Sequence, residues 1–350
     1  MTSSFALPTS IHRALSVSIM ALLLLTLALP AQAAAPQRDR HDQTVSYWTA
    51  DRMASAQPRD FTLKPGRGFV PAAKPEGTGK PDGAGGGGKG GGKPPKTTNV
   101  SGAPWNGGGV ITEASGKVYF EMNGSAYVCS GAVATDTRTD ASLVLTAAHC
   151  AYDETSQTFA SRWLFVPNFD AAPTFNCDQS KYGCWTASAL VVHSGYANAG
   201  AFNSQAAQHD FAFAVVGPGG KTGQSAQLDE TVGSLPISFA TYPDRTRAYA
   251  FGYPAQAPYT GRDLTYCAGP TFSDPYNSGL TYGLTCNMTG GSSGGPWLTS
   301  FSETTGSGVL SSVNSYGYSG INAMHGPKFN DNTQDVYTTA NAATTNVVVP

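Results

Sequence analysis

Short apolar runs separated by polar and glycine-containing segments fill the chain from about residue 103 onward. Runs rich in β-branched and aromatic residues occupy 117–122, 125–134, 142–148, 162–169, 188–193, 210–216, 247–253 and 308–318. Because clusters of Gly, Asn, Asp and Ser separate these runs, each is typical of a β-strand. Helical periodicity is scarce, and a short helix is expected only in the tail, 333–349. The pattern predicts an all-β sandwich or a pair of barrels.

The N-terminal residues follow a different pattern. Arg13 precedes an apolar run, 14–30, which ends in the small residues AQAAA. A basic start, an apolar centre and small residues near Ala33 to Ala35 are typical of a secretory signal. A transmembrane anchor is the alternative, but the run is short and no stop-transfer pattern follows. We therefore expect residues 1–34 to be removed and the mature protein to be secreted, extracellular and free of the membrane.

Residues 35–102 have the composition of a tether rather than of a folded domain. They include a Gly/Pro/Lys tract, 75–96, that lacks the apolar surface needed to offset its ordering entropy, which predicts a disordered linker. Eleven Lys/Arg against six Asp/Glu give 35–102 a net charge of +5, whereas nine against seventeen give 103–350 a net charge of −8. One interpretation is a solvated tether. The other is a pro-segment attracted to the acidic domain until it is cut away.

An acidic domain of this kind disfavours nucleic-acid binding. All six cysteines lie within it, and an even number in an exported chain indicates disulfides, although fifteen pairings are formally possible. Their order suggests that neighbours pair, and the absence of a C-x-x-C motif argues against a zinc site, so no metal and no cofactor is expected. The suggested pairs are Cys129 with Cys150, Cys177 with Cys184, and Cys267 with Cys286.

Three motifs carry candidate chemistry. His149 ends an apolar run of small residues and precedes a cysteine, a rigid place for a general base. Asp210 precedes an apolar run and needs a hydrogen-bond donor if it is drawn inside, and a histidine N–H is a suitable one. Ser293 lies in the glycine-rich stretch 290–297. Each residue alone is more often structural, as a buried histidine, a strand cap or a surface turn.

Taken together, LTAAHC (145–150), HDFAFAVV (209–216) and GGSSGGPW (290–297) resemble the chymotrypsin-like serine peptidases, which carry their catalytic residues in this order. The resemblance covers most of 103–330, and YVCSGAVA matches the strand whose cysteine, here Cys129, pairs with the one beside the catalytic histidine. It implies two six-stranded antiparallel β-barrels with the active site between them. The three ordered motifs are specific in combination, whereas each one alone is weak.

The resemblance implies a Ser-His-Asp mechanism. Ser293 would attack the substrate after His149 accepts its proton, and Asp210 would hold the imidazole in the correct tautomer. Gly291 has no Cβ, so its N–H can turn, with that of Ser293, toward the developing oxyanion. We therefore expect a serine endopeptidase that forms an acyl-enzyme intermediate with protein or peptide substrates.

Two departures concern activation and specificity. In digestive members an Asp precedes the nucleophile, and this Asp pairs with a newly cut N-terminus. Ser292 stands at that position here, so activation by such an ion pair is not expected. The chain is more similar to the bacterial glutamyl-endopeptidase-like branch, and the stretch FGYP at 251–254 also resembles that branch. Asn287 replaces the Asp at the base of the trypsin-like specificity pocket, so a preference for Arg or Lys loses its counter-charge.

The stretch Ser315, Tyr316 and Gly317 is similar to the pocket wall that pairs with an extended substrate in this family. The run that leads into it lacks the histidine of glutamate-specific members, so the side-chain preference stays open. The expected organisation is a signal in 1–34, a pro-segment and linker in 35–102 and a monomeric peptidase domain in 103–350, with the pro-segment as inhibitor. The alternative is a catalytically silent homologue that acts as an extracellular binding module.

Overall fold

The computed structural model describes residues 1–4, 31–63, 69–71, 98–169 and 176–350. Most of the predicted signal and the whole glycine-rich tract lie outside these residues. By its contacts the chain divides into two units, Met1–Arg40 and His41–Pro350. The described part of the first unit contains the beginning of helix α1 (Ala31–Tyr47), and everything below concerns the second unit. No helix within the described ranges is long and apolar enough to cross a membrane.

Six antiparallel strands close into a barrel in the first half of this unit. Each strand pairs with two others, in the order β6, β5, β10, β11, β12 and β7, and β7 returns to β6. Closure leaves no free edge, and the strands β7 and β12 are buried along their whole length. The bounds are β5 (Ser115–Met122), β6 (Ser125–Ala134), β7 (Ser142–Thr146), β10 (Ser161–Pro167), β11 (Trp185–His193) and β12 (Ala212–Val216).

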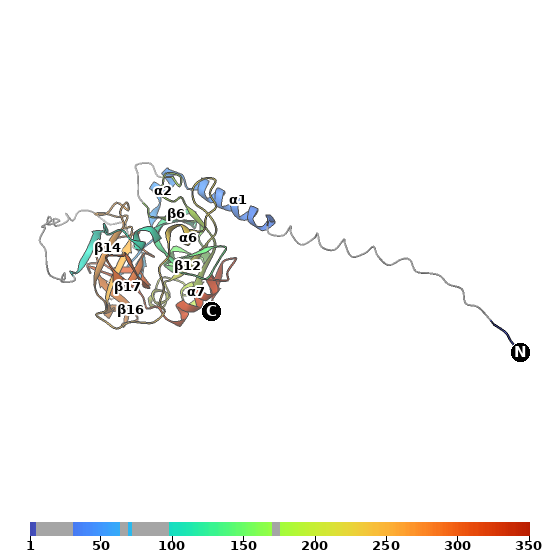
Figure 1. Cartoon of the computed structure of the whole chain (residues 1–350). Coiled ribbons are helices and arrows are strands. Elements are labelled where there is room, and N and C mark those ends of the chain that lie inside the picture. Colours follow the sequence, from blue (N-terminus) through green and yellow to red (C-terminus); the bar gives the residue numbers. More distant parts are fainter. Residues whose placement is uncertain (5–30, 64–68, 72–97, 170–175) are drawn as a thin grey trace. The chain divides into compact units, whose positions relative to one another are not determined.

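The second half holds two sheets. One has the order β18-β17-β13-β14-β4 and the other β15-β16-β20-β19-β2-β3. The strand pairing therefore closes the first of the two predicted barrels, and the second half consists of two packed sheets. The first of these sheets contains β4 (Val100–Pro104), β13 (Arg247–Gly252), β14 (Thr265–Pro270), β17 (Pro296–Ser302) and β18 (Ser307–Val313). The second contains β2 (Phe61–Leu63), β3 (Phe69–Pro71), β15 (Phe272–Ser273), β16 (Thr281–Thr285), β19 (Tyr316–Tyr318) and β20 (Ala323–Pro327). In Figure 1, β6 and β12 mark the barrel, and β14, β16 and β17 mark the second half.

The remaining elements are short. The predicted tail helix is α7 (Asp331–Ala340), which begins with a capping box between Asn330 and Thr333 and packs on β11 and β12. The other helices are α2 (Ala50–Ser55), α3 (Val110–Ala114), α4 (Ser194–Ala197), α5 (Ser204–Gln208), α6 (Leu228–Val232), and the 3₁₀ turns η1 (Ala148–Cys150) and η2 (Pro275–Asn277). The short strands are β1 (Gln57–Pro58), β8 (Tyr152–Asp153), β9 (Thr158–Phe159) and β21 (Val347–Val349).

The segment before residue 64 is folded onto the rest of this unit. Strand β1 pairs in parallel with β6, and β2 pairs in parallel with β19. Trp48, Met53, Phe61 and Leu63 are buried and belong to the main apolar core. The predicted domain boundary after residue 102 falls inside β4, which pairs with β14. Residues on both sides of the glycine-rich tract therefore contribute strands to the second half.

Candidate active site

His149 lies in the turn η1 that follows β7, and Asp210 lies just before β12. These two strands are antiparallel neighbours with Thr146 opposite Ala212, so the register brings both side chains to the same end of the barrel. Asp210 accepts hydrogen bonds from the His149 backbone N–H at 2.9 Å and from Nδ1 at 2.7 Å. Both side chains are fully buried, and the Ser315 hydroxyl also donates to Asp210. The structure thus brings together two residues that lie 61 positions apart in the sequence.

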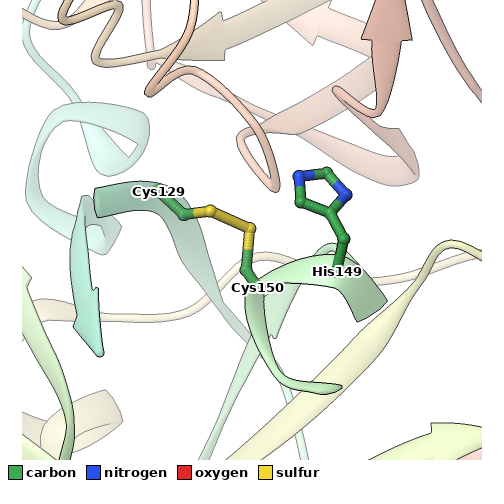
Figure 2. A group of neighbouring side chains, drawn as sticks. All are labelled: Cys129, His149 and Cys150. Atoms are coloured by element: carbon green, nitrogen blue, oxygen red, sulfur yellow. A yellow bond between two sulfur atoms is a disulfide. The ribbon is translucent and has the colours of Figure 1, made fainter. Parts of the chain in front are cut away.

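A disulfide fixes the turn that carries His149. Cys150 is joined to Cys129 on β6, as Figure 2 shows, and the other two bonds join Cys177 to Cys184 and Cys267 to Cys286. These are the pairs that the sequence order suggests. The sulfur atoms near His149 are bonded to each other and offer no thiolate, so this cluster does not meet the needs of a metal site.

The tautomer of His149 follows from these contacts. Because Nδ1 donates its proton to a carboxylate, Nε2 carries a lone pair and can accept a proton. Nε2 is buried and has no hydrogen-bond partner among the described residues. The hydroxyl of Ser293 donates instead to Asp60 Oδ1 at 2.8 Å. In this state the serine and the histidine are therefore not joined by the hydrogen bond that proton transfer would need.

Backbone constraints shape the loop that presents Ser293. Gly291 and Gly294 have φ values of +94° and +78°, which residues with a side chain rarely adopt. A Cβ at Gly294 would lie 2.1 Å from Thr146 Oγ1, so only glycine lets the loop pack against the end of β7. The carbonyl of Ser293 accepts a hydrogen bond from the Ser130 N–H at 2.7 Å, which ties the loop to the barrel. These contacts fix the nucleophile candidate beside β6 and β7.

Asp60 occupies the centre of the site, and the sequence interpretation did not single it out. Its Oδ1 accepts from the Ser293 hydroxyl and, at 3.3 Å, from the Gly291 N–H, the backbone donor predicted to stabilise an oxyanion. Its Oδ2 is buried and has no hydrogen-bond partner among the described residues. Burial raises the pKa of the Asp60 carboxyl, while the hydrogen bond from Ser293 and the electrostatic influence of the nearby His149 ring partly oppose this shift.

The two neighbours of Asp60 are also anchored. Arg59 donates to the His149 carbonyl at 2.5 Å and forms salt bridges of 3.2 Å with Asp153 and Glu154. The ring of Phe61 stacks on Phe202 with centroids 3.9 Å apart and meets the His149 ring edge-on at 5.3 Å. Residues 59–61 therefore contact His149 at both its backbone carbonyl and its ring.

A cavity of about 300 Å³ lies beside Ser293. Its walls include the four residues predicted to bind substrate, Asn287, Ser315, Tyr316 and Gly317, together with Met288 and Met324. The only charged side chain among the lining residues is that of Asp60. Asn287 is exposed, and its side-chain oxygen accepts from the Tyr259 hydroxyl, so it is not a buried base of the pocket. Among the described residues that line the cavity, the Asp60 carboxyl is therefore the one charged group.

A buried carboxylate holds the wall formed by β19. Asp274 accepts from the hydroxyls of Tyr316 at 2.6 Å and Tyr318 at 2.8 Å, and it lies 3.8 Å from His325. Burial lowers the pKa of His325 to about 4, so this histidine is neutral near pH 7. No sequence motif indicated this cluster, because its members come from three separate strands and turns.

Several solved protease structures are similar to this chain. A protease called Anisep from Arthrobacter nicotinovorans is 37% identical, with a TM-score of 0.57, over 70% of this chain and 100% of its own. A thermostable serine protease, AL20, from an extremophilic microorganism is 36% identical, with a TM-score of 0.57, over 67% of this chain and 99% of its own. A Glu endopeptidase solved in complex with MPD is 22% identical, with a TM-score of 0.48, over 65% of this chain and 90% of its own.

No protein-family model matches the chain. The curated protein sequences likewise gave no match. The similar structures are proteases, as the resemblance of the three motifs predicted.

Proposed function

Because the chain belongs to the chymotrypsin-like serine proteases, we propose that it is an exported serine endopeptidase whose residues 57–63 hold it inactive until they are removed. The observation that carries the proposal is the pair of hydrogen bonds to Asp60 Oδ1. They come from the Ser293 hydroxyl and the Gly291 N–H, which are the nucleophile and an oxyanion donor of the predicted mechanism. One carboxyl oxygen thus accepts hydrogen bonds from both the proposed nucleophile and the proposed oxyanion donor.

In the mature enzyme the same atoms would act on a peptide bond. With Asp60 gone, the Ser293 hydroxyl is free to donate to His149 Nε2, which accepts its proton as Oγ attacks the substrate carbonyl carbon. Asp210 stabilises the imidazolium through the 2.7 Å contact to Nδ1. The N–H groups of Gly291 and Ser293 stabilise the tetrahedral oxyanion, and His149 then returns the proton to the leaving amine. Water releases the acyl group by the same steps.

Maturation then requires removal of 57–63 without loss of β4. Strand β4 begins at Val100 and pairs with β14, so a cut C-terminal to it would open a sheet edge. We place the cut between Leu63 and Val100, and the signal before residue 35. The mature protein would be an extracellular monomer with peptides as substrates.

Covalent labelling tests the assignment. Purified precursor is cut within 64–99 by a second protease, the released segment is removed, and both forms are treated with a fluorophosphonate that reports an activated serine. We expect rapid labelling of the cut form, slow labelling of the precursor and none for Ser293→Ala. The matched control is Ser292→Ala. The hydroxyl of this neighbouring serine is buried and donates to the Thr289 carbonyl at 2.8 Å, so labelling of the Ser292→Ala variant should persist.

Absence of labelling in cut, folded wild-type protein would instead favour the silent binding module. Labelling that persists in Ser293→Ala would overturn the nucleophile assignment. Equal labelling rates of the cut form and the intact precursor would leave the protease in place and overturn the inhibitory segment.

A further inference from the structure

The guanidinium of Arg59 lies in a site built from enzyme atoms that the catalytic mechanism does not use. It contacts the His149 carbonyl, Asp153 Oδ2 and Glu154 Oε2. The Arg59 side chain is 11% exposed, and those of Asp153 and Glu154 are 13% and 4% exposed. Two carboxylates and a carbonyl around one planar cation form a site selective for guanidinium, since its fork of N–H donors can reach several acceptors at once.

Both carboxylates are held in place independently of Arg59. Asp153 Oδ1 accepts from the N–H groups of Thr155 at 3.0 Å and Ser156 at 2.7 Å. Although burial opposes the shift, these hydrogen bonds and the Arg59 charge lower the pKa of Asp153. The hydroxyl of the buried Tyr196 donates to Glu154 Oε2 at 2.8 Å. The site is therefore preorganised, and the lowered pKa keeps Asp153 ionised at neutral pH.

Removal of the pro-segment leaves these carboxylates without their cation. Within the described part of the chain, Arg59 is the only basic side chain that forms an ion pair with Asp153 or Glu154. Two adjacent carboxylates that have lost their only basic partner favour the binding of another cation. The free enzyme thus keeps a preformed guanidinium site beside His149.

The position of the Arg59 site relative to Ser293 indicates which side of the scissile bond the site faces. Asp60 lies at Ser293, Phe61 pairs with Tyr316 on β19, and the cavity walled by β19 is on that side. Arg59 lies on the other side, where β1 runs along β6 with Gln57 opposite Tyr127. We assign the acyl part of the substrate to the cavity beside β19, because its wall of Ser315, Tyr316 and Gly317 resembles the one that pairs with an extended substrate. The Arg59 site then faces the leaving part.

We propose that the mature enzyme uses Asp153, Glu154 and the His149 carbonyl to bind an arginine side chain of the substrate, on the leaving-group side of the bond it cuts. This rests on the proposed protease function and adds a specificity determinant to it. Citrulline has the shape of arginine without its charge, so the enzyme should discriminate between the two.

Internally quenched peptides test the site with cut, purified enzyme. A peptide series carries arginine or citrulline at each of the first three positions after the scissile bond, with all other residues constant. We expect kcat/KM at one position to be at least tenfold higher for arginine. In Glu154→Gln this ratio should fall toward one. The matched control is Glu230→Gln, because Glu230 is an exposed acid in helix α6, and it should keep the wild-type ratio.

A second readout covers the case in which Glu154→Gln fails to fold. Synthetic peptides spanning 41–63, with arginine or citrulline at position 59, are tested as inhibitors of the wild-type cut enzyme, and the arginine form should inhibit at least tenfold more strongly. Equal cleavage of both peptides at all three positions, by enzyme that labels with fluorophosphonate, would overturn the substrate site and leave the protease function standing. Cut enzyme that neither labels nor cleaves any peptide would overturn both.

Discussion

Phe61→Ala in the precursor tests how firmly the pro-segment closes the active site. The Phe61 side chain is only 6% exposed, stacks on Phe202 and meets the edge of His149. When the segment leaves the cleft, the ring moves from this apolar site into water. The substitution therefore weakens the closed state and has little effect on the open one.

The size of the effect follows from the burial. Truncating a buried Phe to Ala typically costs about 3 to 5 kcal/mol, and the aromatic pair adds to the area term by about 0.5 to 1.5 kcal/mol. We use the lower bound, about 3 kcal/mol, because water from the neighbouring cavity can fill part of the space that Phe61 leaves. At about 1.4 kcal/mol per tenfold change, the equilibrium between closed and open precursor should shift by about 10²-fold.

The assay is the hydrolysis of a small chromogenic substrate by intact precursor, whose length is checked by mass spectrometry. We expect the basal rate of Phe61→Ala to rise by about 10²-fold, or to the rate of the cut enzyme if that is reached first. Thr62→Ala is the control, because Thr62 is in the same strand and half-buried, and its basal rate should change less than about threefold.

A built-in check separates weakened closure from misfolding. Cutting within 64–99 and removing the segment leaves the wild type and Phe61→Ala with the same sequence, so the two cut enzymes should have the same kcat/KM. If the intact Phe61→Ala precursor keeps the low basal rate of the wild type while its cut form is fully active, the reasoning on closure is wrong.

Three further predictions concern the cut enzyme and the precursor. Ser293→Ala and His149→Ala should each lower kcat by several powers of ten, and the double variant should cost scarcely more, because the residues act as one unit; additive losses would contradict this. Replacing Cys129 and Cys150 together by Ala should lower the free energy of unfolding by about 2 to 5 kcal/mol in urea titrations, and an unchanged midpoint and slope would refute it. Burial raises the pKa of Asp60 in the closed precursor, so Asp60 takes up a proton when the segment closes the site. Closure is therefore most favoured at pH values below the pKa that Asp60 has in the open segment. It weakens as the pH rises through the raised pKa of Asp60 in the closed state. The ratio of precursor to cut-enzyme activity should therefore rise with pH, and Asp60→Asn should flatten this rise; an equally steep rise in Asp60→Asn would show that another group is responsible.

The sequence predicted the barrel well because its strands carry their own signal. The apolar run at 125–134 is strand β6 (Ser125–Ala134), and the runs at 142–148 and 210–216 contain β7 and β12. The helices α4, α5 and α6 were not predicted, since four or five residues are too few to show a helical period. The run at 308–318 divides into β18 and β19, because Asn314 and Ser315 turn inward to bond with Trp297 and Asp210.

The candidate site was predictable only where short motifs mark it. His149, Asp210 and Ser293 each lie in a distinctive stretch, and the fold brings the first two together. Arg59 and Asp60 lie in a polar segment without a motif, and their contacts are with residues 90 or more positions later. The charge contrast between 35–102 and the rest of the chain was the one available signal, but it indicates attraction without identifying a residue.

If the segment inhibits the enzyme as proposed, the way it crosses the site accounts for the absence of a cut at Asp60. A serine nucleophile attacks a carbonyl carbon of the main chain, yet the group held by Ser293 and Gly291 is the Asp60 side chain. A carboxyl group in either protonation state resists nucleophilic attack, because resonance lowers the electrophilicity of its carbon and the group has no good leaving group. The flanking contacts of Arg59 with Glu154 and of Phe61 with Phe202 fix this placement from both sides. In the proposed function, a segment bound in this way occupies the nucleophile and the oxyanion donor without placing a main-chain bond at Ser293, so we expect its release to begin with a cut elsewhere in the chain.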